Sequence, residues 1–454
     1  MQHTDREILR LALPAFLALI AEPLYLLADS AIVGHLGTAQ LAGLGIAGVV
    51  LQTIVGLCVF LAYGTTASVA RHLGADNLRV GLTQGMDGIW LAALIGVLAT
   101  GTGVALHQPL IAAFGVSGEV AHHAETYLGI ALLGVTPLLL MLAATGVLRG
   151  LQDTRTPLYV AVLGNALNVV LNVLLVFGLG PVPALGIAGA ALGSVLAQGV
   201  AAAILVRSVV RAARREGASL RPHFAGVLGA AREGIPLLIR TLTLRAALLL
   251  TTYSVTLAAR RTPGGDAEID LATHQIAFTV WTFLAFALDA VAIAAQALTG
   301  RSLGAGDLAA TRALTRRMVQ WGIGAGVVLG LVVAGVSGVL GPLFTTDPAV
   351  RAALVPVLVV VALGQPLAGL VFILDGVLIG AGDGRYLARA GLLVLALHAP
   401  ATLLVGYAGG SLVAVWCVLS GVFMGARGAV LVHRARSGRW MVTGATLAAS
   451  GGSP

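Results

Sequence analysis

The sequence predicts an all-α integral membrane protein with twelve transmembrane helices, arranged as two six-helix bundles related by a parallel pseudo-two-fold repeat. Three observations lead to this prediction. The composition is too apolar for a soluble protein, apolar runs long enough to cross a bilayer recur along the chain, and the two halves of the sequence repeat each other.

The amino-acid composition indicates a membrane protein rather than a soluble one. Hydrophobic residues make up 58% of the 454 positions and charged residues only 10%, and the mean hydropathy is +0.96. A soluble protein carries about a quarter charged residues, so most of this surface must face lipid. Backbone groups in hydrocarbon must be paired within their own segment, which predicts helices. A membrane β-barrel needs strands of alternating polarity, and residues 161–178 do not alternate.

Apolar runs of 20 or more residues are long enough to span the hydrocarbon core as helices. The first run follows Met1–Arg10 and lacks a convincing small-x-small cleavage site, so we expect it to be retained as a span rather than removed as a signal peptide. The expected spans are residues 11–33, 41–70, 84–106, 125–149, 157–179, 184–206, 234–259, 271–299, 315–341, 352–381, 386–407 and 410–433.

The distribution of arginine predicts the topology. All 27 basic residues are arginine, and with a cytoplasmic N-terminus the outside loops hold only Arg260, Arg261 and Arg351. Loops rich in arginine stay in the cytoplasm, so we expect a multi-pass protein of the plasma membrane with both termini cytoplasmic. The net charge of +8 is then explained by topology and by contact with lipid headgroups. We expect no nucleic-acid partner.

The halves of the sequence repeat each other at an offset of 230 residues. The segment 145–154 resembles 375–384, Leu73-Gly74-Ala75 recurs at 303–305, and Leu41-Ala42 recurs at 271–272. Six spans per half is an even number, so both copies enter the membrane from the same side and the repeat is parallel. The predicted parts are an N-terminal six-helix bundle (1–210), a cytoplasmic linker (211–233), a C-terminal six-helix bundle (234–435) and a cytoplasmic tail (436–454).

Polar residues inside the first span predict a binding site. Glu22, Tyr25 and Asp29 have the spacing i, i+3, i+7, which places them on one helical stripe. A charged side chain at this depth costs about 2.5–3.5 kcal/mol on insertion scales, so it needs a reason to be there. Pro14 and Pro23 interrupt the backbone hydrogen bonds of the same helix and allow a bend.

The fifth span repeats this spacing with Asn165, Asn168 and Asn172. Amides avoid lipid, so the stripe is expected to face the interior of the bundle. An acidic stripe beside an amide stripe can bind a proton, a small cation or a cationic organic molecule. The alternative is that the amides connect helices to one another, a common role for asparagine in membranes.

The second half carries a different set, Arg240, Arg245, Asp289 and Asp375. Arg240 is expected near a membrane end, where its side chain can reach the interface, and Arg245 is expected to pair with Asp289 or Asp375. With Glu22 and Asp29, four buried acids face two arginines. Removal from water disfavours a charged carboxylate, so an acid in excess can take up and release a proton. Proton exchange linked to substrate binding is the basis of antiport.

Other polar residues indicate no chemistry. Cys58 and Cys417 lie inside apolar runs, and His274 and His398 are interpreted as packed histidines. The glycine-rich segment at 380–385 lacks the Gly-Lys-Ser/Thr ending of a phosphate loop. We expect no metal, no cofactor other than a coupling H⁺ or Na⁺, and no enzyme. An intramembrane prenyl transferase would need paired aspartate-rich loops, and Asp153 and Asp383 are isolated.

The sequence resembles the multidrug and toxic compound extrusion (MATE) transporters, specifically the branch similar to the DNA-damage-inducible DinF proteins. The resemblance covers nearly the whole chain. Its motifs are DSAIVGHLGT at 29–38, RGLQDTRTP at 149–157, GNALNVVLN at 164–172, IPLLIRTLTLR at 235–245, THQIA at 273–277, AIAAQALTGRSLGAGD at 292–307 and LDGVLIGAGD at 374–383.

The resemblance implies two six-helix bundles and export of cationic or amphipathic compounds in exchange for protons or sodium. It also implies that Asp29, fifteen positions after Pro14, is the residue that couples protonation to substrate. The remaining members of the implied first-bundle site are Tyr25, Glu22, Asn168 and Ser194.

One departure from the family pattern concerns the coupling ion. The fifth-helix motif of the family usually ends in aspartate, and here Asn172 stands in that position. An amide takes up no proton and removes one negative charge, which would weaken sodium binding. We therefore expect proton coupling through Asp29 alone, in a monomer. The alternative within the superfamily is a flippase of lipid-linked precursors, which would use basic residues in the cavity, and only Arg245 favours it.

Overall fold

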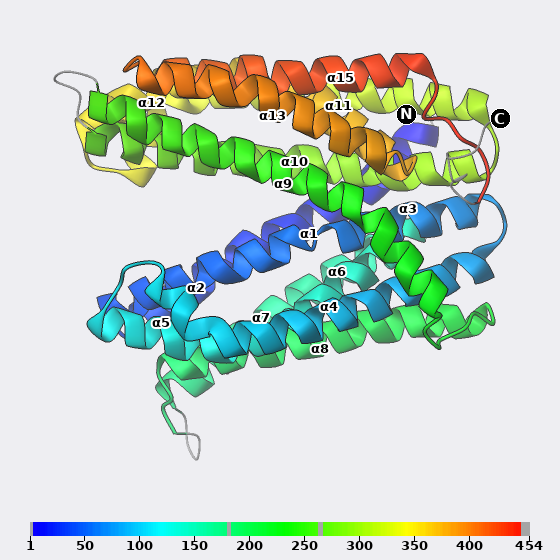
Figure 1. The fold of residues 1–454 in the computed structure, drawn as a ribbon, viewed down its shortest axis with the longest axis horizontal. Helices are drawn as coiled ribbons and strands as arrows, with labels where there is room; N and C mark the ends of the chain where they lie inside the picture. Colours follow the sequence, from blue (N-terminus) through cyan, green and yellow to red (C-terminus); the bar gives the residue numbers. More distant parts are fainter. Residues whose placement is uncertain (1–2, 179–182, 262–266, 446–454) are drawn as a thin grey trace. The chain divides into compact units, whose positions relative to one another are not determined.

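The computed structural model describes residues 3–178, 183–261 and 267–445, and the regular secondary structure in these ranges is entirely helical (Figure 1). Twelve segments of this part of the chain are long and apolar enough to cross a membrane. The predicted all-helical fold with twelve spans is therefore confirmed. Residues 446–454 of the predicted tail lie outside the described residues.

The chain packs as two compact units. The first, here called the N-bundle, comprises Leu13–Gly234. Its helices are α1 (His3–Gly34, from Leu13 on), α2 (Thr38–Leu57), α3 (Phe60–Gly74), α4 (Leu78–Ala112), α5 (Gly118–Ala131), the 3₁₀ turn η1 (Leu132–Gly134), α6 (Val135–Gly150), α7 (Arg155–Phe177) and α8 (Ile187–Arg215).

The second unit, the C-bundle, comprises Ile235–Pro454 together with Met1–Ala12. Its helices are α9 (Phe224–Arg261, from Ile235 on), α10 (Ala267–Gly304), α11 (Leu308–Phe344), α12 (Pro348–Gly380), α13 (Gly384–Tyr407), α14 (Leu412–Cys417), the π-turn η2 (Val418–Phe423) and α15 (Met424–Ser437). Six spans belong mainly to each bundle.

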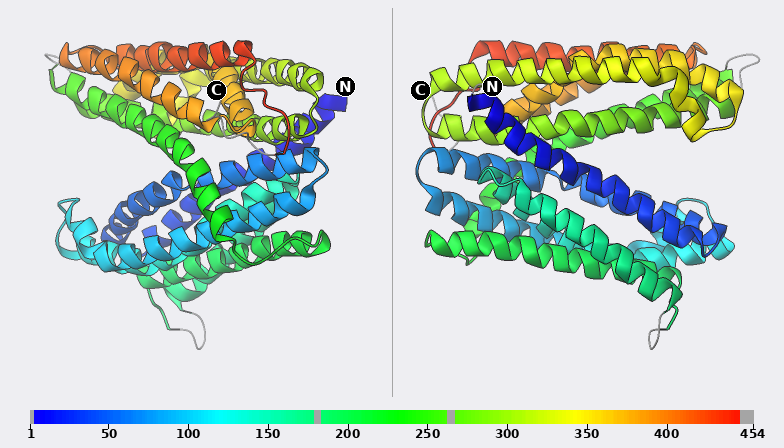
Figure 2. Two further views of the ribbon diagram at one scale, coloured as in Figure 1. Left: turned by 45° about the vertical axis from the view of Figure 1, so that its right-hand side comes forward. Right: turned by 180° about the vertical axis from the view of Figure 1, so that it is seen from behind.

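The chain changes units inside two helices, α1 and α9, each time two residues before a proline. The boundary in α1 precedes Pro14, and the boundary in α9 precedes Pro236. Helix α1 nevertheless runs as one helix through Pro14 and Pro23 (Figure 2). Its first turn is fixed in the C-bundle, where the buried Asp5 carboxylate accepts hydrogen bonds from Arg317 at 2.7 and 2.9 Å and from Trp321 at 2.9 Å.

The loop between the bundles is shorter than the predicted linker 211–233. Helix α8 continues to Arg215 and α9 begins at Phe224, so helix extends into the linker from both ends. Hydropathy ends a span at its first charged residues, whereas the helix itself continues into water. The loop is held by α4: Trp90 Nε1 donates to the carbonyl of Leu220 at 3.0 Å, and Asp87 accepts from the backbone N–H of His223 at 3.0 Å.

In the C-bundle, α11 and α12 approach closely along a row of glycines. Gly322, Gly326 and Gly330 are spaced four apart on one face of α11. A Cβ atom on Gly326 would lie 2.3 Å from the carbonyl oxygen of Gln365, and one on Gly330 would lie 2.5 Å from that of Ala362. Lipid gives apolar helices no reason to associate, so close backbone packing of small residues supplies the attraction.

Replacing Gly326 by leucine is therefore expected to separate α11 from α12 and to destabilise the protein by about 1–3 kcal/mol, the usual effect of overpacking. The measurement is the thermal unfolding midpoint of the purified protein in detergent. Gly324→Leu is the matched control, because a Cβ at Gly324 meets nothing within 4 Å. Equal midpoints for the two variants would contradict the role assigned to the glycine row.

Candidate functional site

A buried carboxylate lies at the centre of the N-bundle site. Asp29, on α1, is only 2% exposed. Its Oδ2 accepts a hydrogen bond from the hydroxyl of Tyr127 on α5 at 3.0 Å, and its Oδ1 accepts one from the amide of Asn172 on α7. Both donors are neutral, and no basic side chain in the described residues forms an ion pair with Asp29. The carboxylate is solvated by dipoles alone.

The predicted amide stripe on α7 does face this carboxylate. Asn172 Nδ2 also lies 3.4 Å from Asn168 Oδ1, and Asn168 Nδ2 donates to Ser194 Oγ on α8 at 3.0 Å. Asn165 donates to the carbonyl of Ala21 on α1 at 2.6 Å. The stripe thus connects α1, α7 and α8. Its amides hold these helices together, and Asn172 also contacts the carboxylate.

One acceptor in the cluster is left over. The Oδ1 atom of the fully buried Asn172 receives no hydrogen bond from any group that the structure describes. Gly193 on α8 makes room for it, because a Cβ at Gly193 would lie 2.1 Å from that oxygen. The cluster therefore retains a hydrogen-bond acceptor in addition to the carboxylate, which suits a site for a proton or a cation.

The other predicted members of the site lie at different places. Tyr25 is half-buried, and its hydroxyl oxygen accepts from Gln198 Nε2 at 3.4 Å, so it borders the cluster through α8. Glu22 is exposed. Glu22 and Asp29 share a helical stripe, as predicted, but seven residues separate them by about 10 Å along the axis, so Glu22 lies outside the Asp29 cluster.

Sequence reasoning missed Tyr127 and Gln198. Both are uncharged, so neither attracted attention in a search for buried charge. The signal that was available is the polar tip of a tyrosine on a membrane-spanning helix, which finds a hydrogen-bond partner when it is buried.

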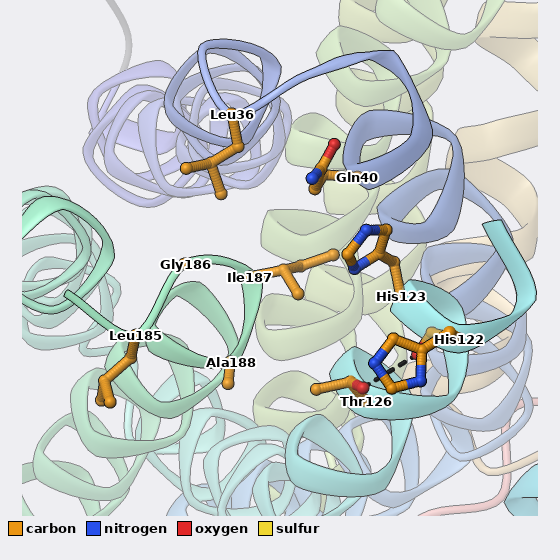
Figure 3. Close-up of a pocket in the computed structure, with 9 residues that line it drawn as sticks. All are labelled: Leu36, Gln40, His122, His123, Thr126, Leu185, Gly186, Ile187 and Ala188. Atoms are coloured by element: carbon orange, nitrogen blue, oxygen red, sulfur yellow. Dashed lines mark hydrogen bonds between the residues drawn. The ribbon is translucent and has the colours of Figure 1, made fainter. Parts of the chain in front are cut away.

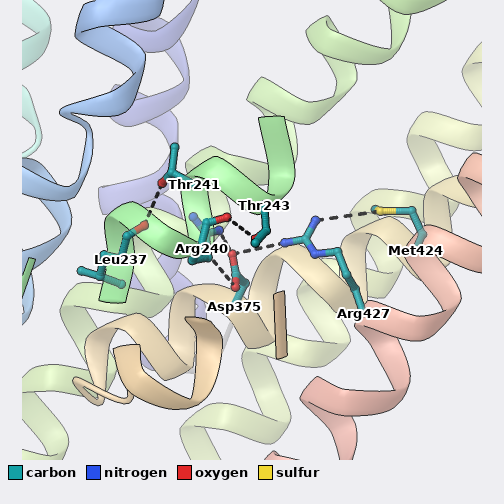
Figure 4. A network of polar contacts seen from close by, with 7 residues as sticks. All are labelled: Leu237, Arg240, Thr241, Thr243, Asp375, Met424 and Arg427. Carbon is teal, nitrogen blue, oxygen red and sulfur yellow. Dashed lines mark hydrogen bonds and ion pairs between the residues drawn. The ribbon is translucent and has the colours of Figure 1, made fainter. Parts of the chain in front are cut away.

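The C-bundle site has the opposite electrostatic character (Figure 4). Asp375 on α12 is 6% exposed and accepts from Arg240 of α9, through Nε at 3.2 Å and through Nη2. A second guanidinium, that of Arg427 on α15, lies 3.4 Å from Oδ2 of the same carboxylate. Thr243 and Leu387 border a cavity of only about 20 Å³ beside this network, large enough for a single water.

This arrangement corrects two predictions. The side chain of Arg240 does not reach out to the interface, because it is buried and paired with Asp375. Arg245 is exposed and does not pair with Asp375. Arg427 was not predicted as a partner of Asp375, yet α15 carries it into the bundle with only 11% of its side chain exposed. Asp289, the other predicted partner of Arg245, is half-buried on α10.

The two histidines that the sequence analysis singled out in the C-bundle, His274 and His398, are packed, as predicted. His398 is fully buried, with Nε2 3.0 Å from the hydroxyl of Thr251, and His274 Nε2 lies 3.1 Å from the hydroxyl of Thr252. The described residues contain no group of three or more histidine, cysteine, aspartate or glutamate side chains placed to hold a metal ion.

Comparison with known proteins identifies the family. The family model MatE matches residues 14–174 and 248–404, and thus includes Asp29, the asparagine stripe and Asp375. The chain belongs to the MATE family. It is 32% identical to Protein DETOXIFICATION 44, chloroplastic, of Arabidopsis thaliana over 86% of this chain and 74% of that protein. It is 31% identical to the DNA damage-inducible protein F of Escherichia coli over 68% of this chain and 65% of that protein.

Solved structures support the same fold. A Vibrio cholerae MATE transporter in a bent form matches with a TM-score of 0.84 at 22% identity, covering 96% of this chain and 98% of that chain. An outward-facing MATE transporter of the MOP superfamily also matches with a TM-score of 0.84, at 21% identity over 96% of each chain. At these identities the likeness establishes two six-helix bundles, and the chain is a multi-pass membrane transporter of the MATE type.

The electrostatic contrast between the two MATE bundles predicts different outcomes for two matched substitutions. Asp375→Asn leaves Arg240 and Arg427 buried beside a neutral side chain, and breaking a buried ion pair in this way costs about 3–5 kcal/mol. Asp29→Asn removes a charge that has no counter-charge, so it is expected to leave stability almost unchanged. Thermal unfolding of both variants in detergent checks this, and an Asp375→Asn protein as stable as wild type would contradict it.

Proposed function

We propose that this MATE protein is a secondary-active efflux transporter that exports cationic or amphipathic organic compounds in exchange for protons, with Asp29 as the coupling carboxylate. Relatives named as probable multidrug resistance proteins support the efflux part of the proposal, among them NorM of Thermotoga maritima at 27% identity. The observation that carries the coupling part is that Asp29 is buried and held by neutral donors only.

A coupling site must be able to lose and regain its charge. Asp375 is unsuited to this, because two guanidinium groups stabilise its charged form and oppose its protonation. Asp29 has the opposite situation: its charged form is disfavoured by removal from water, so either a proton or a cationic substrate satisfies it. The two cargoes compete for one carboxylate, which is the requirement for antiport.

The exchange follows from that competition. With Asp29 ionised, a cationic substrate supplies the missing counter-charge, and Asn172 and Tyr127 orient the carboxylate. When a proton binds Asp29, the charge that held the substrate disappears and the substrate is released. A proton gradient directed into the cell then drives release on the outside. Alternating access in the family's two-bundle fold supplies the change of side.

The coupling ion and the orientation belong to the same proposal. Sodium prefers several oxygen ligands with more than one negative charge nearby, and Asn172 contributes an amide where a carboxylate would strengthen such a site, so the proton is favoured. The clustering of arginine predicts a plasma-membrane protein with cytoplasmic termini. The ion pair of Glu7 with Arg301 agrees with this, since it places the N-terminal turn at the end of α10 that is predicted to be cytoplasmic. We propose a monomer with membrane lipid and a small organic molecule as its partners.

The test is transport of a fluorescent organic cation in proteoliposomes under an imposed pH gradient or an imposed sodium gradient. Wild type is expected to respond to the pH gradient, and Asp29→Asn to lose at least nine-tenths of that transport while keeping its folded state. Sodium-driven transport that ignores the pH gradient would refute proton coupling. Absence of transport of any cation by well-folded wild type would refute the efflux function and favour the flippase of lipid-linked precursors.

A second prediction concerns the amide that replaces the usual acid of the family. Asn172→Asp places two carboxylates against each other in a buried site, where they cannot both stay ionised without a cation between them. We expect the variant to gain a response to sodium gradients that wild type lacks, and to bind sodium measurably in calorimetry. Asn165→Asp is the matched control, because Asn165 contacts the backbone of α1 at Ala21 and not Asp29. A sodium response in both variants, or in neither, would contradict the role given to position 172.

A further inference from the structure

A pocket of about 290 Å³ opens at one end of the N-bundle (Figure 3). Under the proposed topology this is the outer end of the protein, and we call the feature the outer pocket. It contains two histidines in surroundings that are otherwise uncharged. Its lining residues are Leu36, Gln40, His122, His123, Thr126, Leu185, Gly186, Ile187 and Ala188.

The outer pocket lies directly outward of the Asp29 cluster along two helices. On α5, His123 lines the pocket and Tyr127, four residues further, donates to Asp29. Residues four apart lie on the same helical face, about 6 Å from each other along the axis. On α8, Ile187 lines the pocket and Ser194, seven residues deeper, belongs to the asparagine cluster. Leu36 follows the end of α1, the helix that carries Asp29.

The two histidines differ in exposure. His122 is exposed and His123 is half-buried, and their ring centroids are 5.7 Å apart. Figure 3 shows the ring of His123 directed toward Gln40 of α2, with the side chain of Ile187 beside it. His123 packs where α2 has a glycine, since a Cβ at Gly43 would lie 3.0 Å from the Cβ of His123. The chain thus places one imidazole at the mouth and one further in, on the side facing Tyr127.

Few other titratable groups lie near the outer pocket. Helix α2 has none. Helix α8 has only arginines in its C-terminal third, far from Ile187, and α4 has Arg79 and Asp87 at its far end. The remaining groups on the nearby parts of the elements that border the pocket are Glu22, Tyr25 and Asp29 on α1, His35 after α1, His107 on α4, and Glu119, Glu125 and Tyr127 on α5 itself. The two histidines are therefore the titratable side chains that line the pocket, and neutral histidine is the side chain best suited to accept a proton near pH 7.

We propose that the outer pocket is the entry vestibule of the coupling proton, and that His123 transfers the proton through Tyr127 to Asp29. This rests on the proposed proton antiport. An outside proton binds a free ring nitrogen of His123. It then passes to the hydroxyl oxygen of Tyr127 while the original hydroxyl proton moves to Asp29 Oδ2, so the tyrosine is neutral before and after. His122 supplies protons from the solvent side. His123 relays the proton and does not contact the substrate. Asp29 remains the residue that binds the substrate.

The test is chemical rescue in proteoliposomes whose outward face is exposed to the assay buffer. His123→Ala is expected to slow pH-driven transport about tenfold, a modest loss for a lost proton carrier because water replaces part of it. Imidazole added to the outside buffer is expected to restore most of the rate, with no change in the affinity for the organic cation. His107→Ala, a histidine on α4 that does not line the pocket, is expected to show neither the loss nor the rescue.

A second measurement keeps the proposal testable if His123→Ala folds poorly. In a protein with Cys58 and Cys417 replaced by alanine, Ala188→Cys is treated from outside with the cationic thiol reagent MTSET. Blocking the vestibule is expected to abolish pH-driven transport, whereas Phe114→Cys, at the same end but outside the pocket lining, is expected to be unaffected.

The outcomes separate the two proposals. Wild-type rates for His123→Ala and for MTSET-treated Ala188→Cys, with transport still lost in Asp29→Asn, would overturn the vestibule and leave proton antiport standing. A slow His123→Ala that imidazole fails to rescue, together with an unblocked Ala188→Cys, would also overturn it. Wild type that ignores a pH gradient would overturn the proposed function itself.

Discussion

The site in the N-bundle depends on one constraint, a carboxylate placed in a low-dielectric bundle without a counter-charge. A buried ion without an opposite charge is costly, and proteins normally avoid it by pairing or neutralising the group. At Asp29 the chain provides only dipoles, from Tyr127 and Asn172. Dipoles stabilise the charge enough for it to form, and leave it able to bind a proton or a cation. Two neutral donors and an amide oxygen without a donor are consistent with a site that binds a cargo and releases it.

The C-bundle contains a buried aspartate that, unlike Asp29, is paired with arginine. Asp375 is about as buried as Asp29, yet Arg240 and Arg427 fix its charge. Such a network contributes to structural specificity rather than to exchange, because losing either partner leaves a charge buried. Burial of an acid is therefore insufficient to identify a coupling site. The sign and mobility of the neighbouring charges decide, and these become visible only when the helices are packed.

This explains which features were predictable from sequence. Span number, helix class and the asparagine stripe depend on hydrophobicity and helical period, which are local properties, and the structure agrees with them. The partners of Asp375 depend on which helices pack together and at what depth, and no local pattern contains that information. Arg427 is the clearest case: it lies inside the expected span 410–433, and only the packing of α15 against α12 brings its guanidinium to Asp375. Tyr127 was missed because a single hydroxyl barely changes hydropathy.

The internal repeat sharpens this argument, since it places equivalent residues in different surroundings. At the offset of 230, Asp153 corresponds to Asp383, and Thr145 corresponds to Asp375. Asp153 accepts from the backbone N–H groups of Arg155 and Thr156, both at 3.0 Å, at the start of α7, whereas Asp383 forms an ion pair with Arg434 at 2.6 Å.

The repeat thus keeps the positions of helices and turns while the charges on them diverge. A neutral Thr145 gives the N-bundle no equivalent of the Asp375 network. Arg71 on α3 is also buried in the N-bundle, but no basic side chain in the described residues forms an ion pair with Asp29, so this carboxylate has no permanent counter-charge. The asymmetry between the bundles, rather than the shared fold, is therefore the physical reason to assign proton exchange to the N-terminal half.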